Sequence, residues 1–142
     1  MLDLLLMLAG IVTTMQPEYA DKYWAATCEL AEADCSEIEA PLVAAIDTRP
    51  GLMGYYFPGT NIIFLTDRCL LDVADRVECE ATVVHEMAHY LANELDIHQD
   101  DDCANEAFAW DLFNRYVRHR GRWDLQQILW KENYKACLLP KR

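Results

Sequence analysis

Glycine and proline are scarce in this sequence, which has five of each among 142 residues. Disordered chains are typically poor in hydrophobic residues, whereas 53% of this one is hydrophobic. No internal repeat or linker divides it. We therefore expect residues 1–142 to form a single domain, because a chain of this length is large enough for one core and too short for two.

Positive charge is also in short supply. Lys and Arg total 12 against 24 Asp and Glu, which gives a formal net charge of -12. Nucleic acids bind to positively charged surfaces, so we expect no nucleic-acid partner. The basic residues that are present gather at 114–123. That cluster is more typical of a solvated helix end than of a site for an anionic partner.

No apolar run is long enough to span a bilayer, so we expect no stable membrane span. The run from Leu4 to Val12 has the length of a signal-peptide core, but Asp3 precedes it and no good cleavage site follows. Residues 1–16 are therefore either a degenerate export signal or a buried first helix.

The sequence lacks any C-x-x-C pair, which disfavours a structural zinc knuckle. Six scattered cysteines instead favour disulfides and an oxidising compartment. Buried reduced thiols in a cytoplasmic protein are the alternative. The cysteines and the apolar start together favour an extracytoplasmic or secreted protein. Sequence separation suggests three pairs: Cys28–Cys35, Cys69–Cys79 and, between two late helices, Cys103–Cys137.

Helical spacing of apolar residues predicts helices at about 18–33 and 75–95. An acidic loop follows, and Asp102 is a suitable N-cap for a further helix at about 103–119. The segment 124–137 predicts a last helix, which Pro140 closes.

Strand signals lie between the first two helices. A short strand candidate follows Pro41, and two β-rich runs at 55–57 and 62–65 flank the turn residues 58–61, which predicts a hairpin. The expected fold class is therefore α+β, mostly helical, with a small antiparallel sheet just before the central helix.

The segment TVVHEMAHYL (82–91) carries His85, Glu86 and His89 inside that central helix. Four residues turn an α-helix by about 400°, so the two histidines project from one side, one turn apart. Two imidazoles so placed can bind one zinc ion. Glu86 lies about 100° further round the helix, from where it can reach a water on the ion and act as general base. A pair of histidines on a helix surface, with no ion, is the alternative.

A third ligand must come from elsewhere, because the sequence after His89 lacks the glycine and third histidine of the metzincins. Glu106 is the best candidate, since an antiparallel return after the acidic loop would bring the first turn of the next helix toward the histidines. Its alternative role is that of an ordinary carboxylate near a helix N-terminus. Glu94 and Asp96 are fallback ligands, but they lie on or just past the same helix.

The motif His85-Glu86-x-x-His89, followed by Asn105-Glu106-Ala107, resembles the gluzincin metallopeptidases, in which a downstream helix supplies a glutamate as third zinc ligand. The run EAFAWDLF (106–113) also resembles the E-A-x-x-F-A segment of the small zincin-like proteases related to the phage-repressor-cleaving family. The likeness covers about residues 52–116.

The resemblance implies a zincin-like domain that binds one Zn²⁺ and hydrolyses a peptide or protein. In such enzymes an edge strand pairs with the extended substrate, and residues 61–67 would be that strand here. The rival interpretation is an inactive zincin-fold binding or regulatory protein with a structural metal. The sequence does not indicate the oligomeric state.

Two features depart from the gluzincin pattern. That pattern has an aspartate four residues after the ligand glutamate, whereas position 110 is Trp and Asp111 follows it. The residue that would stabilise the transition state is also not evident, and four residues are candidates: Tyr55, Tyr56, Tyr116 and His119.

Overall fold

The computed structural model describes residues 11–14, 17–46, 54–66, 69 and 75–127. Within these ranges the protein is α+β and mostly helical, as expected. The helices are α2 (Pro17–Leu30), α4 (Arg76–Glu94) and α5 (Asp102–His119), and a 3-10 turn, η1 (Trp123–Leu125), follows them.

The sheet is mixed rather than purely antiparallel. Its strand order is β1-β2-β4-β3, formed by β1 (Ile11–Thr14), β2 (Leu42–Ile46), β4 (Ile62–Thr66) and β3 (Gly54–Tyr56). The expected hairpin is confirmed, because β3 and β4 pair antiparallel. The strand after Pro41 is β2, and it runs parallel to β4. The apolar pattern of a single strand identifies its buried face but does not specify its neighbour, so this parallel pair was not predicted.

Strand β1 corrects the expectation for the start of the chain. Residues 11–14 are all β-branched, a composition that favours a strand, and they pair antiparallel with β2. The interpretation of this segment as a buried first helix is therefore wrong for these four residues. The rest of the segment 1–16 lies outside the described residues.

Most helix ends differ from expectation by one to three residues, whereas α5 ends at His119 as expected. Helix α2 ends at Leu30, where Glu32 adopts a positive φ of 53° and the Ala33 N–H bonds the Cys28 carbonyl. The N-cap of α5 is Asp101, whose side chain accepts from the Ala104 N–H, so Asp102 is the first helical residue instead. Of the expected last helix, the start is a 3-10 turn, and residues 128–137 lie outside the described ranges.

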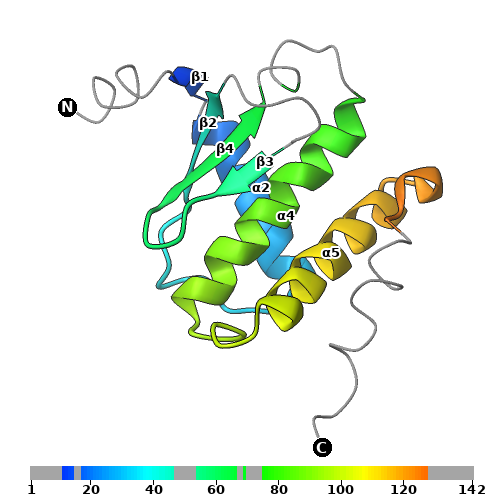
Figure 1. Cartoon of the computed structure of the whole chain (residues 1–142). Helices are drawn as coiled ribbons and strands as arrows, with labels where there is room; N and C mark the ends of the chain where they lie inside the picture. The colour runs from blue at the N-terminus through cyan, green and yellow to red at the C-terminus, as the bar shows by residue number, and fades with distance from the viewer. Residues whose placement is uncertain (1–10, 15–16, 47–53, 67–68, 70–74, 128–142) are drawn as a thin grey trace, which may run out of the picture.

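Helix α4 is central to the fold (Figure 1). It packs against β3 and β4 on one side and against α2 and α5 elsewhere. Its N-terminus is capped by Asp75, which accepts from the backbone N–H groups of Val77 and Glu78. Seven of its apolar side chains have 1% exposure or less: Ala81, Val83, Val84, Met87, Ala88, Leu91 and Ala92. Because burial of this kind contributes about 1.5–3 kcal/mol for each large side chain, α4 is a firm support for the residues that it presents.

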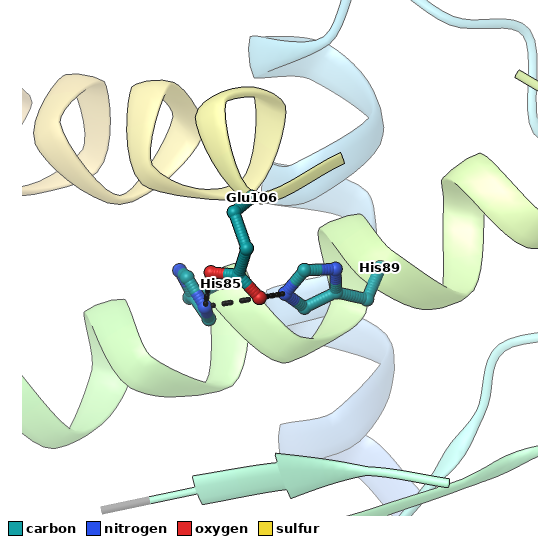
Figure 2. Close-up of side chains that lie close together, drawn as sticks. All are labelled: His85, His89 and Glu106. Carbon is teal, nitrogen blue, oxygen red and sulfur yellow. Dashed lines mark hydrogen bonds and ion pairs between the residues drawn. The ribbon is translucent and has the colours of Figure 1, made fainter. Parts of the chain in front are cut away.

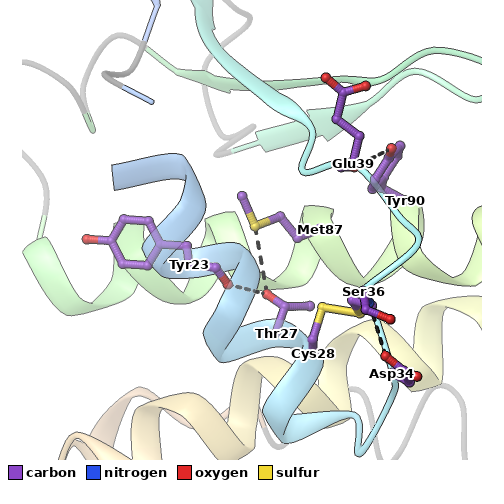
Figure 3. The surroundings of a disulfide bond; sticks show 9 residues. Tyr23, Thr27, Cys28, Asp34, Ser36, Glu39, Met87 and Tyr90 are labelled. Atoms are coloured by element: carbon purple, nitrogen blue, oxygen red, sulfur yellow. Dashed lines mark hydrogen bonds between the residues drawn. A yellow bond between two sulfur atoms is a disulfide. The ribbon is translucent and has the colours of Figure 1, made fainter. Parts of the chain in front are cut away.

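Two expected disulfides are confirmed, Cys28–Cys35 and Cys69–Cys79. Figure 3 shows the first, beside Thr27, which donates to the Tyr23 carbonyl at 2.7 Å and contacts the Met87 sulfur at 3.8 Å. The Cys28–Cys35 disulfide therefore fixes the end of α2 close to its contact with α4.

The third expected disulfide pair is Cys103–Cys137. Cys103 is also disulfide-bonded, and Cys137, its expected partner, lies outside the described residues. Disulfides form and persist in oxidising surroundings, so these bonds indicate a non-reducing, extracytoplasmic environment.

None of the helices in the described ranges combines the length and apolar character that crossing a membrane demands.

Candidate metal centre

Three side chains converge between α4 and α5: His85, His89 and Glu106 (Figure 2). The two histidine Nε2 atoms are 3.3 Å apart. Glu106 places Oε1 3.0 Å from His89 Nε2 and Oε2 3.7 Å from His85 Nε2. A tetrahedral ion with ligands at about 2.0–2.1 Å holds them about 3.4 Å from one another. The observed separations lie on either side of that value, so these residues could hold a metal ion.

The reversal between the helices brings Glu106 to the histidines, as expected. Asp96 and His98 have positive φ angles of 54° and 59° in the loop that joins α4 to α5. This left-handed backbone, which Asp and His tolerate better than most residues, turns the chain back along α4. Glu106 is the fifth residue of α5 and so lies in its second turn, one turn later than predicted. The fallback residues Glu94 and Asp96 are not part of the group.

Asn105 supports the site in a way that the sequence pattern did not reveal. Its side-chain oxygen is hydrogen-bonded to Nδ1 of His89. As an amide oxygen only accepts, Nδ1 carries the proton and Nε2 keeps its lone pair for a metal. Such partners orient metal-binding histidines. The available signal was the position of Asn105 directly before Glu106.

His85 is held differently. Its Nδ1 is buried and has no hydrogen-bond partner among the described residues. The Trp110 ring packs instead on the imidazole, with centroids 4.2 Å apart. Trp110 occupies the position where the gluzincin pattern has an aspartate, and an indole has no acceptor for a histidine N–H. Ring packing thus supports this histidine, and the backbone of Ala109 is close enough to act on its pKa.

Burial and the close contacts set the protonation of the group. Burial lowers the pKa of His85 to about 3, and the neighbouring His89 adds to the effect. Burial also acts to lower the pKa of His89, but the hydrogen bond with Glu106 and the nearby carboxylates outweigh it and raise that pKa. Burial acts to raise the pKa of Glu106, yet its contact with His89 lowers it overall. Because metal ions compete with protons for imidazole lone pairs, His85 offers a nitrogen that is free at neutral pH.

Glu86 lies beside the group without belonging to it. Its Oε1 is 3.9 Å from His85 Nε2, and the residue is only 7% exposed. Burial raises the pKa of its carboxyl to about 7, against the opposing effects of His89 and the Tyr56 backbone N–H. A group that titrates near neutrality is suited to accept a proton and then to release it.

The group opens into a cavity of about 780 Å³ between α4, α5 and β3. β3 is the edge strand of the sheet on this side, whereas β4 has neighbours on both sides. The expectation that residues 61–67 form the edge strand is therefore wrong, because the parallel pair with β2 covers the second side of β4.

The candidates for stabilising a transition state are separated by the fold. Tyr56 is among the residues that line the cavity, and its hydroxyl donates to the Thr60 carbonyl at 3.3 Å. Tyr116 and His119 line a different depression, around Glu80. The side chain of Tyr55 is not among those described. Of the three described candidates, Tyr56 alone lines the cavity that holds the metal-ligating group.

Gly54, the first residue of β3, is required by the close approach of this strand to α4. A Cβ atom there would lie 2.8 Å from Thr82 Cγ2 and 3.1 Å from Glu86 Cγ. We expect Gly54→Ala to destabilise the protein by about 1–3 kcal/mol, as overpacking does, measured by thermal unfolding. Thr82→Ser removes the methyl group nearest to the added Cβ atom. The double variant should therefore regain part of the lost stability. Equal stability of Gly54→Ala and the wild type would contradict this packing.

The arrangement thus brings together all four residues that the motif singles out, three as ligand candidates and one as a neighbouring carboxyl. Two helices supply them, and the edge strand borders the cavity that they face. Comparisons of the chain with protein-family models, with curated proteins and with solved structures find no match.

Proposed function

We propose that this protein is a zinc-dependent metallopeptidase, in which His85, His89 and Glu106 bind one Zn²⁺ and Glu86 is the general base. The observation that carries the proposal is the convergence of one ligand atom from each of three residues, all within 4.8 Å of one another, beside a buried carboxyl and an open cavity. No fourth histidine, cysteine or acidic residue belongs to the group within the described ranges. Three protein ligands leave a position for water, which is the mark of a catalytic rather than a structural zinc.

The ligand types favour zinc over other ions. Two imidazole nitrogens and one carboxylate are a common set for zinc, whereas magnesium and calcium prefer oxygen ligands alone. Because Nδ1 of His89 forms the hydrogen bond with Asn105, its Nε2 is left to bind the ion.

The chain's own residues divide the chemical work. A zinc ion, when bound, lowers the pKa of its water and polarises a substrate carbonyl. Glu86 accepts the proton of the attacking water and passes it to the departing amine nitrogen as the peptide C–N bond breaks. Its pKa, raised by burial, suits both halves of that transfer.

A peptide is the substrate that the cavity fits best. β3 is an edge strand beside the site, and edge strands bind extended peptides through their free backbone groups. The disulfides are in keeping with work outside the cytoplasm, so we place the enzyme in an extracytoplasmic or secreted setting.

Metal analysis combined with peptide hydrolysis tests the proposal. Protein purified with its disulfides intact should contain about one zinc per chain and cleave members of a mixed peptide library. A chelator should remove both the zinc and the activity, and stoichiometric Zn²⁺ should restore both. Protein that binds zinc tightly but cleaves no peptide would support the rival interpretation, a zincin-like binding protein.

A further inference from the structure

We propose that the cleft selects substrates with a lysine or arginine side chain, which Glu78 binds against the aromatic wall formed by Trp110 and Phe113. This inference rests on the proposed function, because it names the substrate class of that same site. It follows from the charge of the cavity, from the place of Glu78 on α4 and from the character of the wall opposite.

The cavity is lined by acidic residues and, within the described part of the chain, by no lysine or arginine. Glu86 and Glu106 lie at its centre, where a zinc ion would balance their charge. Two carboxylates are left over, those of Glu78 and Asp102. Neither forms an ion pair with any described residue, so a substrate meets negative charge that the described residues do not neutralise.

The arginines nearest to these elements are engaged elsewhere. Arg76 is the first residue of α4, and its guanidinium lies 3.7 Å from the carboxylate of Glu80. Arg122 is paired with Asp75 at 2.9 Å and with Asp124 at 3.0 Å. Arg120 pairs with Glu80 on the far side of α4, in a second depression. Among the described residues, Glu78 therefore supplies the unpaired charge at the end of the cavity nearest the N-terminus of α4.

Glu78 lies at a defined distance from the metal ligands. It precedes His85 by seven residues, and with Thr82 between them it lies on the helix face that lines the cavity. Seven residues of α-helix rise about 10 Å, which an extended peptide covers in about three residues. A side chain about three positions from the cleaved bond would therefore reach this carboxylate.

Helix α5, which packs against α4, contributes two aromatic rings to the cavity wall. Trp110 and Phe113 are in contact, with ring centroids 5.1 Å apart, and both line the cavity. Because α5 runs back along α4, residues after Glu106 lie toward the end of α4 that carries Glu78. Lysine and arginine combine an apolar stem with a cationic tip. Trp110 is partly exposed and Phe113 is buried behind it, so this end offers the indole surface together with one carboxylate. Cations are also attracted to aromatic faces.

The opposite end of the cavity is a poorer cation site. Asp102 is exposed there, and the amides of Asn93 and Gln99 also line the cavity. Glu78 is half-buried, and a charge interaction is stronger where less water surrounds it. The selectivity is therefore assigned to Glu78.

The test uses the zinc-loaded protein and N-acetylated peptides that differ at one position, with lysine, arginine, norleucine or glutamate placed two to four residues from the cleaved bond. The wild type should show a kcat/KM about tenfold higher for lysine or arginine than for norleucine at one of these positions, and salt should reduce that ratio. Glu78→Gln should lose the ratio and retain cleavage of the norleucine peptide. Glu78→Lys should cleave the glutamate peptide in preference.

A matched control is Glu29→Gln, which makes the same charge change at an exposed position of α2 outside the cavity and should leave the ratio unchanged. Asp102→Asn should reduce it by less than Glu78→Gln. If the wild type cleaves peptides without this preference, or if Glu78→Gln lowers both rates equally, the assignment of Glu78 is overturned and the metallopeptidase stands. If the zinc-loaded wild type cleaves none of the peptides, both proposals fail.

Discussion

The Glu86→Gln variant should retain one zinc ion per chain and lose peptide hydrolysis by about 10²–10⁴-fold, the range that a positioned general base contributes. Glutamine has the shape of glutamate but cannot accept the proton of the attacking water. Glu86 is the neighbour of the proposed metal ligands and not one of them, with its Oε1 3.9 Å from His85 Nε2. Its replacement therefore removes the base and leaves the ligands in place.

Stability separates this effect from misfolding. Burial raises the pKa of Glu86, which means that its charged form is disfavoured in this environment. A neutral amide of the same size avoids that cost, so Glu86→Gln should unfold at the same temperature as the wild type or higher. The measurements are kcat/KM on one peptide, zinc content and thermal unfolding. Activity within tenfold of the wild type would exclude Glu86 as the base, and loss of zinc would make it a ligand.

Exposed Glu94 provides the matched control for this variant. It lies at the end of the same helix and outside the cavity, so Glu94→Gln makes the same chemical change without touching the reaction. We expect wild-type hydrolysis from it. A comparable loss of activity in both variants would show that the charge of α4, and not the position of residue 86, governs the rate.

The site could be predicted from the sequence because its parts are local or nearly so. Helical geometry alone places His85 and His89 on one face, and a short acidic loop is enough to return α5 to them. The hairpin of β3 and β4 and two disulfides are also short-range features, and the spacing of their residues predicts them.

The features that were missed depend on contacts between segments far apart in the chain. The parallel pairing of β2 with β4 moves the edge of the sheet from β4 to β3, and no local pattern records it. Asn105 is an ordinary helix residue until α5 is packed on His89. Trp110 departs from the gluzincin pattern and is expected to be a packing residue, but its contact with His85 becomes visible only in three dimensions.

Glu106→Ala should weaken zinc binding more than Glu86→Gln, Asn105→Ala or Glu106→Gln. Loss of a partner that only orients a ligand costs about 10–100-fold in metal affinity. Loss of a ligand itself should exceed that, so we expect a decrease of more than about 100-fold, with hydrolysis lost at zinc concentrations that saturate the wild type. A competition titration against a chromophoric chelator measures the affinity.

Asn105→Ala and Glu106→Gln should weaken zinc binding by less than Glu106→Ala does. Asn105→Ala removes only the hydrogen bond to His89 Nδ1 and should fall within the 10–100-fold range. Glu106→Gln keeps an oxygen within reach but loses the negative charge, so its affinity should lie between those of the wild type and Glu106→Ala. The order of the three variants distinguishes a ligand from a residue that merely supports one.

The other role open to Glu106, that of a carboxylate near the start of a helix, predicts a different result. Such a carboxylate stabilises the helix by about 0.3–1 kcal/mol through the macrodipole and has no effect on metal binding. Glu106 lies in the second turn of α5, where that effect is already falling off, and its carboxylate contacts His89 at 3.0 Å. Because the carboxylate is directed at the imidazoles, we expect the metal-free variant to unfold within about 1 kcal/mol of the metal-free wild type, while the zinc-dependent increase in stability is lost. Full zinc affinity in Glu106→Ala would assign the residue to the helix and remove the third ligand on which the hydrolytic mechanism depends.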